Sequence, residues 1–160
     1  MVGKIVLGLD RTIRALAAAG RWLALPIMLL LFLQWPLREG LGRWSREAND
    51  LGQCVFALYV AIAMTAATRA GRHLSADLIA HRYGDRLRRR LHAIAILTAT
   101  LPWSAFVLWK AWRPVVMSIG GLERFQDTDD PGYFVVKAAL LLLAAMVAIQ
   151  GVLDLRRGAA

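Results

Sequence analysis

The segment 51–68 contains no Asp, Glu, Lys, Arg or His. A helix needs about 20 residues, in a range of roughly 17–25, to cross the hydrocarbon core of a bilayer. Three further apolar segments come near this length, at about 22–37, 93–109 and 133–153. The sequence therefore predicts an all-α integral membrane protein with four transmembrane helices.

Composition supports a membrane protein. Hydrophobic residues make up 58% of the 160 residues, against about 45–50% in an average soluble domain. The formal charge of +9 is compatible with nucleic-acid binding, but the basic residues flank apolar segments and do not line one soluble face. We therefore expect no nucleic-acid partner. No internal repeat or low-complexity linker divides the chain, so residues 1–160 are expected to form a single membrane domain.

The first apolar segment argues against a cleaved signal peptide, and the single cysteine argues against a disulfide or a multi-cysteine metal site. The first segment is followed by the polar residues 34–39 and not by a small-x-small cleavage site. We therefore expect it to remain as a membrane anchor instead of being removed as a signal peptide. Cys54 has no second cysteine to pair with, which excludes an intramolecular disulfide and a multi-cysteine metal site.

The distribution of Lys and Arg orients the four segments. Thirteen of the 20 lie in the N-terminal arm, in the connection between the second and third segments, and in the C-terminal tail, whereas six lie in the other two connections. An excess of basic residues marks the cytoplasmic side of a membrane protein. The sequence therefore predicts that both termini and the middle connection are cytoplasmic.

The middle connection has its own periodicity. Apolar side chains recur there every four or five residues with arginines between them, at Leu74, Leu78, Ile79, Tyr83, Leu87 and Leu91. This pattern predicts an amphipathic helix on the inner membrane surface, ended by Gly84, with Asp85 then capping the third span. A solvated, positively charged loop that only sets the topology is the alternative.

The spans lack the residues that most membrane chemistry requires. None has an acidic residue near its middle, which a proton-driven multidrug pump needs. No broken helix marks a midplane substrate site, and no nucleophile–base pair or phosphate-binding loop is present. The histidines, His73, His81 and His92, fall in or beside the middle connection, so they cannot face each other across a haem inside the bundle. We expect no enzymatic activity, no cofactor and no bound metal.

Charged residues near the span ends are candidate contact sites. Lys137 lies about one turn into the fourth span, so it either snorkels to the outer interface or pairs with an acidic residue of this chain or of a partner. Asp127, Asp129 and Asp130 lack the spacing of a calcium loop. Solvation and helix capping, with Asp130 before a first-turn Pro131, explain them better. Contact with an extracytoplasmic partner is a second possibility.

Three polar residues, Glu47, Asn49 and Asp50, open the second span. Asn49 or Asp50 can cap the helix, and the acidic side chains favour its positive N-terminal end. Docking onto another protein is the alternative explanation of this group.

The flanks of the second span are similar to a known family. The segment 47–51 (EANDL) resembles the acidic, polar start of span two in the small membrane subunit (Q-type, DctQ-like) of tripartite ATP-independent periplasmic (TRAP) transporters. The segment 69–78 (RAGRHLSADL) resembles that family's R-x-G-x-H-hydrophobic-x-x-D-hydrophobic motif. Residues 34–39 and 131–137 lie where the family has its polar exit from span one and its proline-led start of span four. The resemblance covers nearly the whole chain in length, span order and orientation.

The resemblance implies a role and a set of partners. Such transporters import organic acids with a sodium gradient, and a periplasmic substrate-binding protein delivers the substrate to a membrane pair. The large permease subunit holds the substrate and sodium sites and moves its transport domain like an elevator. The small subunit would then be a scaffold of the bacterial inner membrane, in contact with the large subunit, the binding protein and membrane lipids. A stand-alone four-helix transporter or channel is the alternative.

The resemblance and the charge pattern together indicate which residues meet a partner or lipid. These candidates are Arg38, Glu47, Asn49, Asp50, Arg69, Gly71, Arg72, His73, Asp77 and Lys137.

Overall fold

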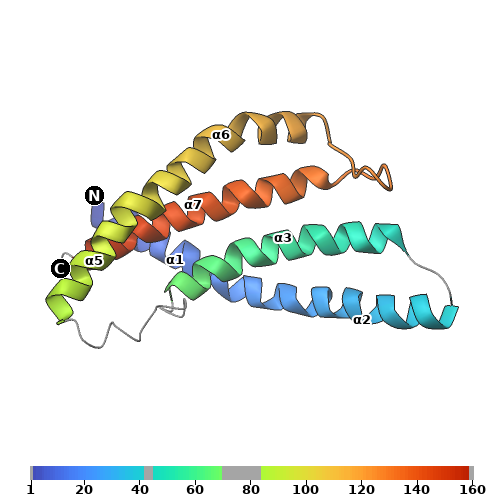
Figure 1. Ribbon diagram of the computed structural model, residues 1–160, viewed down its shortest axis with the longest axis horizontal. Coiled ribbons are helices and arrows are strands. Elements are labelled where there is room, and N and C mark those ends of the chain that lie inside the picture. The colour runs from blue at the N-terminus through green and yellow to red at the C-terminus, as the bar shows by residue number, and fades with distance from the viewer. Residues whose placement is uncertain (1, 42–44, 70–83, 159–160) are drawn as a thin grey trace.

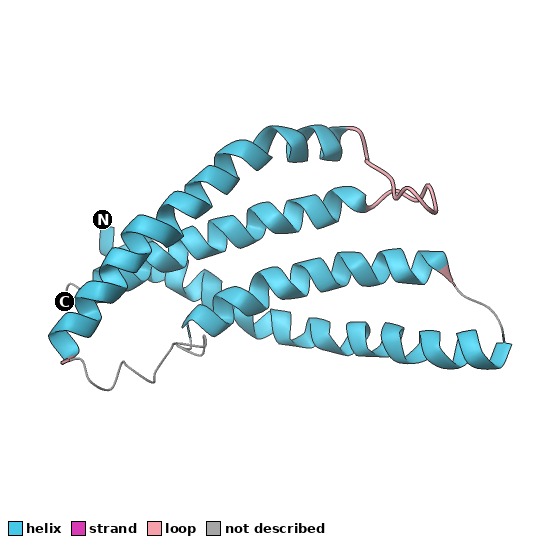
Figure 2. Cartoon of the chain, in the orientation of Figure 1, coloured by secondary structure: helices cyan, strands magenta, loops and turns pink. Residues whose placement is uncertain are grey.

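The computed structural model describes residues 2–41, 45–69 and 84–158, and these residues are almost entirely helical (Figures 1 and 2). The helices are α1 (Val2–Gly20), a 3-10 turn η1 (Arg21–Leu23), α2 (Ala24–Leu41), α3 (Arg46–Arg69), α5 (Asp85–Ala95), a π-helical turn η2 (Ile96–Thr100), α6 (Leu101–Gly120) and α7 (Tyr133–Gly158). Within the described residues, four helical stretches are long and apolar enough to cross a membrane. The prediction of an all-helical, four-span chain is thereby confirmed.

The helices extend beyond the apolar segments from which they were predicted. The third stretch covers Arg86–Gly120 and not only 93–109. Arginine is a good helix former, so the basic turns before the apolar run continue the helix. Hydropathy marks only the part of a helix that suits lipid, whereas the helix ends where backbone hydrogen bonding ends. For the same reason α7 begins at Tyr133 as predicted but continues to Gly158.

The π-helical turn η2 joins α5 to α6 just before Pro102. Proline has no backbone N–H and its ring crowds the preceding turn. A π turn inserts one residue into the helical register, which lets the helix continue past such a residue. Figure 1 shows that the path from α5 into α6 is curved and unbroken.

The predicted surface helix falls largely on residues 70–83, which lie outside the described residues. The last two positions of its apolar pattern, Leu87 and Leu91, lie beyond Gly84 and belong to α5. Gly84 occupies the N-cap position of α5 with an extended backbone, and Asp85 is the first helical residue. The prediction that Asp85 caps the third span was therefore wrong by one position.

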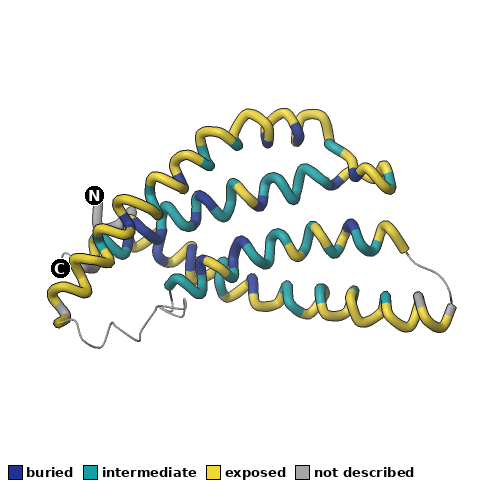
Figure 3. Tube along the Cα trace, in the orientation of Figure 1, coloured by how far each residue is buried: buried dark blue, intermediate teal, exposed yellow. Residues whose placement is uncertain are grey.

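The four long stretches run side by side between two ends (Figure 1). The start of α1, the end of α3 and the end of α7 lie at one end, which we call the terminal end. The connection 121–132 and the start of α3 lie at the other end, which we call the loop end. Helix α7 packs against both α3 and α6, and α2 packs against α3. Figure 3 shows that burial is concentrated on α7 and α3, whereas α2 and α6 are mostly exposed.

The best-buried apolar cluster ties α1 to the bundle. It is formed by Ile13 of α1, Ile62 of α3, and Met146 and Leu153 of α7. Four partly buried residues pack around it, namely Leu16, Leu23, Leu142 and Ile149. The N-terminal arm is thus a packed helix that lies against the ends of α3 and α7. Its sequence had indicated only a concentration of positive charge.

Candidate functional site

A network of charged and hydroxyl groups at the loop end joins α6 to α7. Lys137 Nζ lies 2.7 and 2.6 Å from the two carboxylate oxygens of Glu123, and 5.3 Å from the centre of the Tyr133 ring. The Ser118 hydroxyl donates a further hydrogen bond to Glu123. Of the two explanations offered for Lys137, the structure favours pairing with an acidic residue of the same chain.

The pairing changes the acidity of Glu123, which lies in the connection outside the spans. The hydrogen bonds from Lys137 hold the pKa of Glu123 below its ordinary value of 4.5, and the Ser118 hydroxyl contributes in the same direction. The folded protein therefore takes up the proton less readily than the unfolded chain does. It follows that this contribution to stability is complete above about pH 4.5 and is lost as the pH falls through the lowered value.

Lys137→Met is expected to remove this pH-dependent contribution. The melting temperature in detergent should be lower for the variant by a constant amount from about pH 6 to pH 8, and the difference should shrink below pH 4.5. Lys137→Arg keeps the positive charge and should follow the wild type. Parallel melting curves for wild type and Lys137→Met down to pH 3 would show that Glu123 is not held by this pair.

Asp50 anchors the connection 121–132 to α3. Its side chain is buried, with 6% of the residue exposed, and it accepts a 2.5 Å hydrogen bond from the Thr128 hydroxyl. One turn further along α3, the Cys54 thiol lies 3.5 Å from the Gly132 carbonyl oxygen. Gly132 has φ +156°, and a Cβ there would lie 3.1 Å from the Phe125 ring, so this position requires glycine.

Thr128→Val is expected to lower the free energy of unfolding by about 1–2 kcal/mol, because the buried Asp50 carboxylate loses its hydroxyl donor. Equilibrium unfolding in mixed micelles measures the change. Thr98→Val is the matched control, since the exposed Thr98 hydroxyl bonds to the Ile94 carbonyl one turn earlier in the same continuous helical stretch. Equal effects of the two substitutions would mean that the contact between Thr128 and Asp50 contributes nothing to stability.

The predicted caps of the second and fourth spans were both misplaced. Ser45, not Asn49 or Asp50, caps α3: its hydroxyl oxygen accepts a 3.2 Å hydrogen bond from the Ala48 amide and the hydroxyl donates to Glu47 at 2.9 Å. The helix begins at Arg46, so Asn49 and Asp50 already lie within it. Cap preference identifies the residue types that can cap a helix. Which of them does so depends on where the helix begins, because the cap flanks the first helical residue.

At the fourth span, Asp130 was predicted to cap the helix and Pro131 to lie in its first turn. Helix α7 instead begins at Tyr133, so both residues precede it. Pro131 forms an isolated antiparallel bridge with Arg124, and the first turn of α7 is closed by the Val135 amide on the Gly132 carbonyl at 2.9 Å. Within the described residues, no group of three or more His, Cys, Asp or Glu side chains is arranged to hold a metal ion. Backbone groups of Asp129 and Asp130 form hydrogen bonds with those of Phe125 and close the turn.

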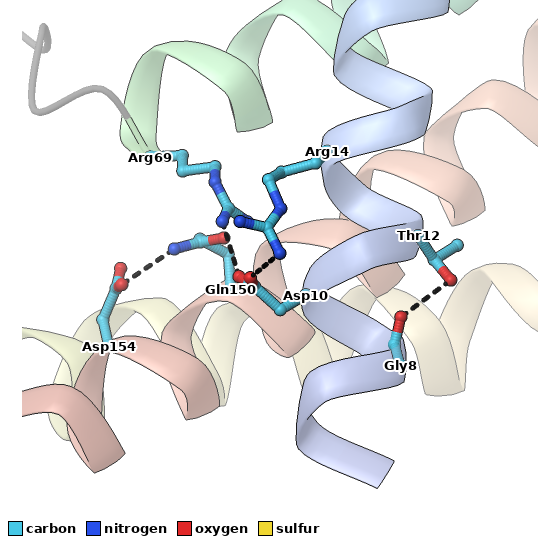
Figure 4. A network of polar contacts seen from close by, with 7 residues as sticks. All are labelled: Gly8, Asp10, Thr12, Arg14, Arg69, Gln150 and Asp154. Atoms are coloured by element: carbon cyan, nitrogen blue, oxygen red, sulfur yellow. Dashed lines mark hydrogen bonds and ion pairs between the residues drawn. The ribbon is translucent and has the colours of Figure 1, made fainter. Parts of the chain in front are cut away.

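A second charged network lies at the terminal end (Figure 4). Arg69, the last residue of α3, lies 2.5 Å from Asp10 of α1, and Arg14 lies 2.9 Å from the other carboxylate oxygen. Only 17% of the Arg69 side chain and 10% of the Asp10 side chain are exposed. On α7, Gln150 is buried and donates to Asp154 at 2.8 Å. The ion pair joins α1 to α3, whereas the bond between Gln150 and Asp154 lies within α7.

Sequence reasoning singled out Arg69 but missed its partner. Asp10 is the single acidic residue before Glu39, and its i, i+4 spacing from Arg14 is a recognisable helical pair. That signal identifies a charged face on α1. It does not identify Arg69, which is 59 residues away.

The remaining candidate residues lie in different parts of the chain. Glu47 is exposed and Asn49 half-buried at the loop end, and Arg38 belongs to α2. Four candidates, Gly71, Arg72, His73 and Asp77, lie outside the described residues.

Comparison with known proteins gives one match. Residues 27–160 match the family model described as "Tripartite ATP-independent periplasmic transporters, DctQ component". No curated protein and no solved structure matches the chain. The matched family is one of transporter components and not of enzymes, and its match includes all of the described helices from α3 onward and most of α2. The chain is thus a multi-pass membrane protein that belongs to the DctQ family, the small component of TRAP transporters.

Proposed function

We propose that this chain is the scaffold subunit of a sodium-driven, binding-protein-dependent importer of organic acids, located in the bacterial inner membrane. It supports a large elevator-type permease subunit and does not itself bind or move the substrate. The observation that carries this proposal is the position of its charges: the paired acids Asp10, Asp50, Glu123 and Asp154 all lie near the ends of the bundle. The middle of each span is left without an acidic group that could couple ion and solute movement.

The proposed orientation places the terminal end in the cytoplasm and the loop end in the periplasm. It is supported by the excess of Lys and Arg in the N-terminal arm, between the second and third spans, and in the C-terminal tail. Reporter fusions test it directly. A fusion within 86–90 should report the cytoplasm and a fusion within 127–130 the periplasm, and the reverse pattern would overturn the charge argument.

The partners follow from the tripartite system. We expect the large permease subunit beside this chain in the membrane, and a periplasmic substrate-binding protein at the loop end. Sodium binds only to the large subunit, so this chain carries no cofactor. The chain should copurify from native membranes with a much larger polytopic protein. Recovery of the chain only as an isolated, stable monomer would contradict the proposal.

Assembly is expected to depend on the motif that follows the second span. Replacing Arg72 and Asp77 together should reduce recovery of the large subunit more than replacing Arg88 and Arg89, although the second pair removes more positive charge. The amount of large subunit retained per tagged small subunit measures the effect. Equal losses would mean that bulk charge, and not the motif, drives assembly.

A further inference from the structure

The junction of α1 and α2 carries a groove that the proposed function does not use. It is an open groove of about 480 Å³ lined by Ala18, Arg21, Trp22 and Leu25. These residues follow the i, i+3, i+4, i+7 spacing of one helix face. Trp22 is 72% exposed and Leu25 57% exposed, so the groove opens outward and away from the bundle core.

The groove combines one fixed positive charge with an apolar wall. No described carboxylate forms an ion pair with Arg21, whereas Arg14 and Arg69 share Asp10. The guanidinium of Arg21 therefore keeps its N–H donors for an external acceptor, and its planar fork suits a phosphate. Trp22 and Leu25 supply the apolar surface beside it.

The depth of the groove matches the boundary between headgroups and hydrocarbon. The next charged residue after Arg21 is Arg38, and the 16 uncharged positions between them would span about 24 Å as a helix. That length is close to the hydrocarbon thickness of a bilayer, about 30 Å. Arg21 thus lies at the headgroup level, Trp22 at the interface where tryptophan is favoured, and Leu25 among the acyl chains.

We propose that this groove binds an anionic phospholipid, with the phosphate on Arg21 and an acyl chain along Trp22 and Leu25. Charge complementarity selects the occupant: the groove has a positive group without an intrachain partner at headgroup level, and an apolar continuation directed into the membrane. A zwitterionic lipid matches the wall equally well, but its own ammonium group offsets the attraction to Arg21. A basic residue at the membrane surface contributes about fivefold to binding of an anionic lipid.

Native mass spectrometry of the full-length chain in detergent tests the site. Phosphatidylglycerol and phosphatidylcholine with identical acyl chains are the two probes. Arg21→Gln should weaken phosphatidylglycerol retention about fivefold and leave phosphatidylcholine unchanged. Trp22→Ala should weaken retention of both lipids, because it removes the apolar wall. Free glycerol phosphate at millimolar concentration should displace neither lipid, since it lacks the acyl chain.

Arg90→Gln is the matched control, because Arg90 is exposed on α5 and does not line the groove. It should leave the retention of both lipids close to wild type. Equal losses of phosphatidylglycerol for Arg21→Gln and Arg90→Gln would overturn the site in favour of bulk charge. Unchanged lipid retention with loss of a protein partner in Arg21→Gln would overturn it in favour of a protein contact. Circular dichroism of each variant shows whether the helices are intact.

Discussion

Arg69→Met is expected to lower the free energy of unfolding by about 2–3 kcal/mol. The substitution removes the Arg69 guanidinium from the largely buried carboxylate of Asp10, which is also paired with Arg14. It also disconnects the end of α3 from α1. Equilibrium unfolding in mixed micelles measures the loss, and limited proteolysis should show faster cleavage within α1.

Two further variants show whether the loss of stability comes from the pair of Asp10 and Arg69. Arg88→Met makes the same chemical change on an exposed position of α5, and it should alter stability by less than about 0.5 kcal/mol. Asp10→Asn combined with Arg69→Met should cost clearly less than the sum of the two single changes, because the pair is lost only once. Additive costs would show that Asp10 and Arg69 do not act on each other.

Gly20→Ala is expected to destabilise the chain by about 1–3 kcal/mol through overpacking. A Cβ on Gly20 would overlap the Cγ2 atom of Ile62 and lie 3.1 Å from its Cβ. These atoms sit at the branch point of a β-branched side chain, which is stiff and has little room to turn away. The end of α1 would therefore be pushed off α3. The melting temperature in detergent and the accessibility of α1 to protease report the change.

Gly8→Ala is the matched control in the same helix, since nothing lies within 4 Å of a Cβ built there. Alanine is the better helix former by about 1 kcal/mol, so this variant should be at least as stable as the wild type. In the background of Ile62→Ala, Gly20→Ala should become nearly neutral because the overlapping atom has gone. A Gly20→Ala variant as stable as the wild type would mean that α1 does not approach α3 at this point.

Patterns that repeat along the chain were enough to predict the helices. The uncharged run 51–68 predicted α3 because a long apolar segment with no charged residue has few alternatives to a buried or membrane helix. The fourth span was likewise placed to within a turn at its start. The charged and polar ends were predicted less well. Ser45 was missed as a cap, and the cap of the third span was predicted at Asp85 and not at Gly84.

The contacts of the candidate site were harder to predict than its residues. Lys137 and Arg69 were singled out because a charge at a span end has to be paired or solvated. Their partners, Glu123 and Asp10, depend on which helix ends meet in space. No local pattern encodes either meeting: α1 meets α3 through the apolar cluster around Ile13, and Glu123 meets Lys137 through the turn between α6 and α7.

Reconstitution into liposomes tests the central claim most directly. Purified chain, purified large subunit and their complex are inserted separately, and sodium-driven uptake of a labelled organic acid is measured with the cognate binding protein present. The scaffold role predicts no uptake by the chain alone and full uptake by the complex. Sodium-dependent uptake by liposomes that contain only this chain would contradict it.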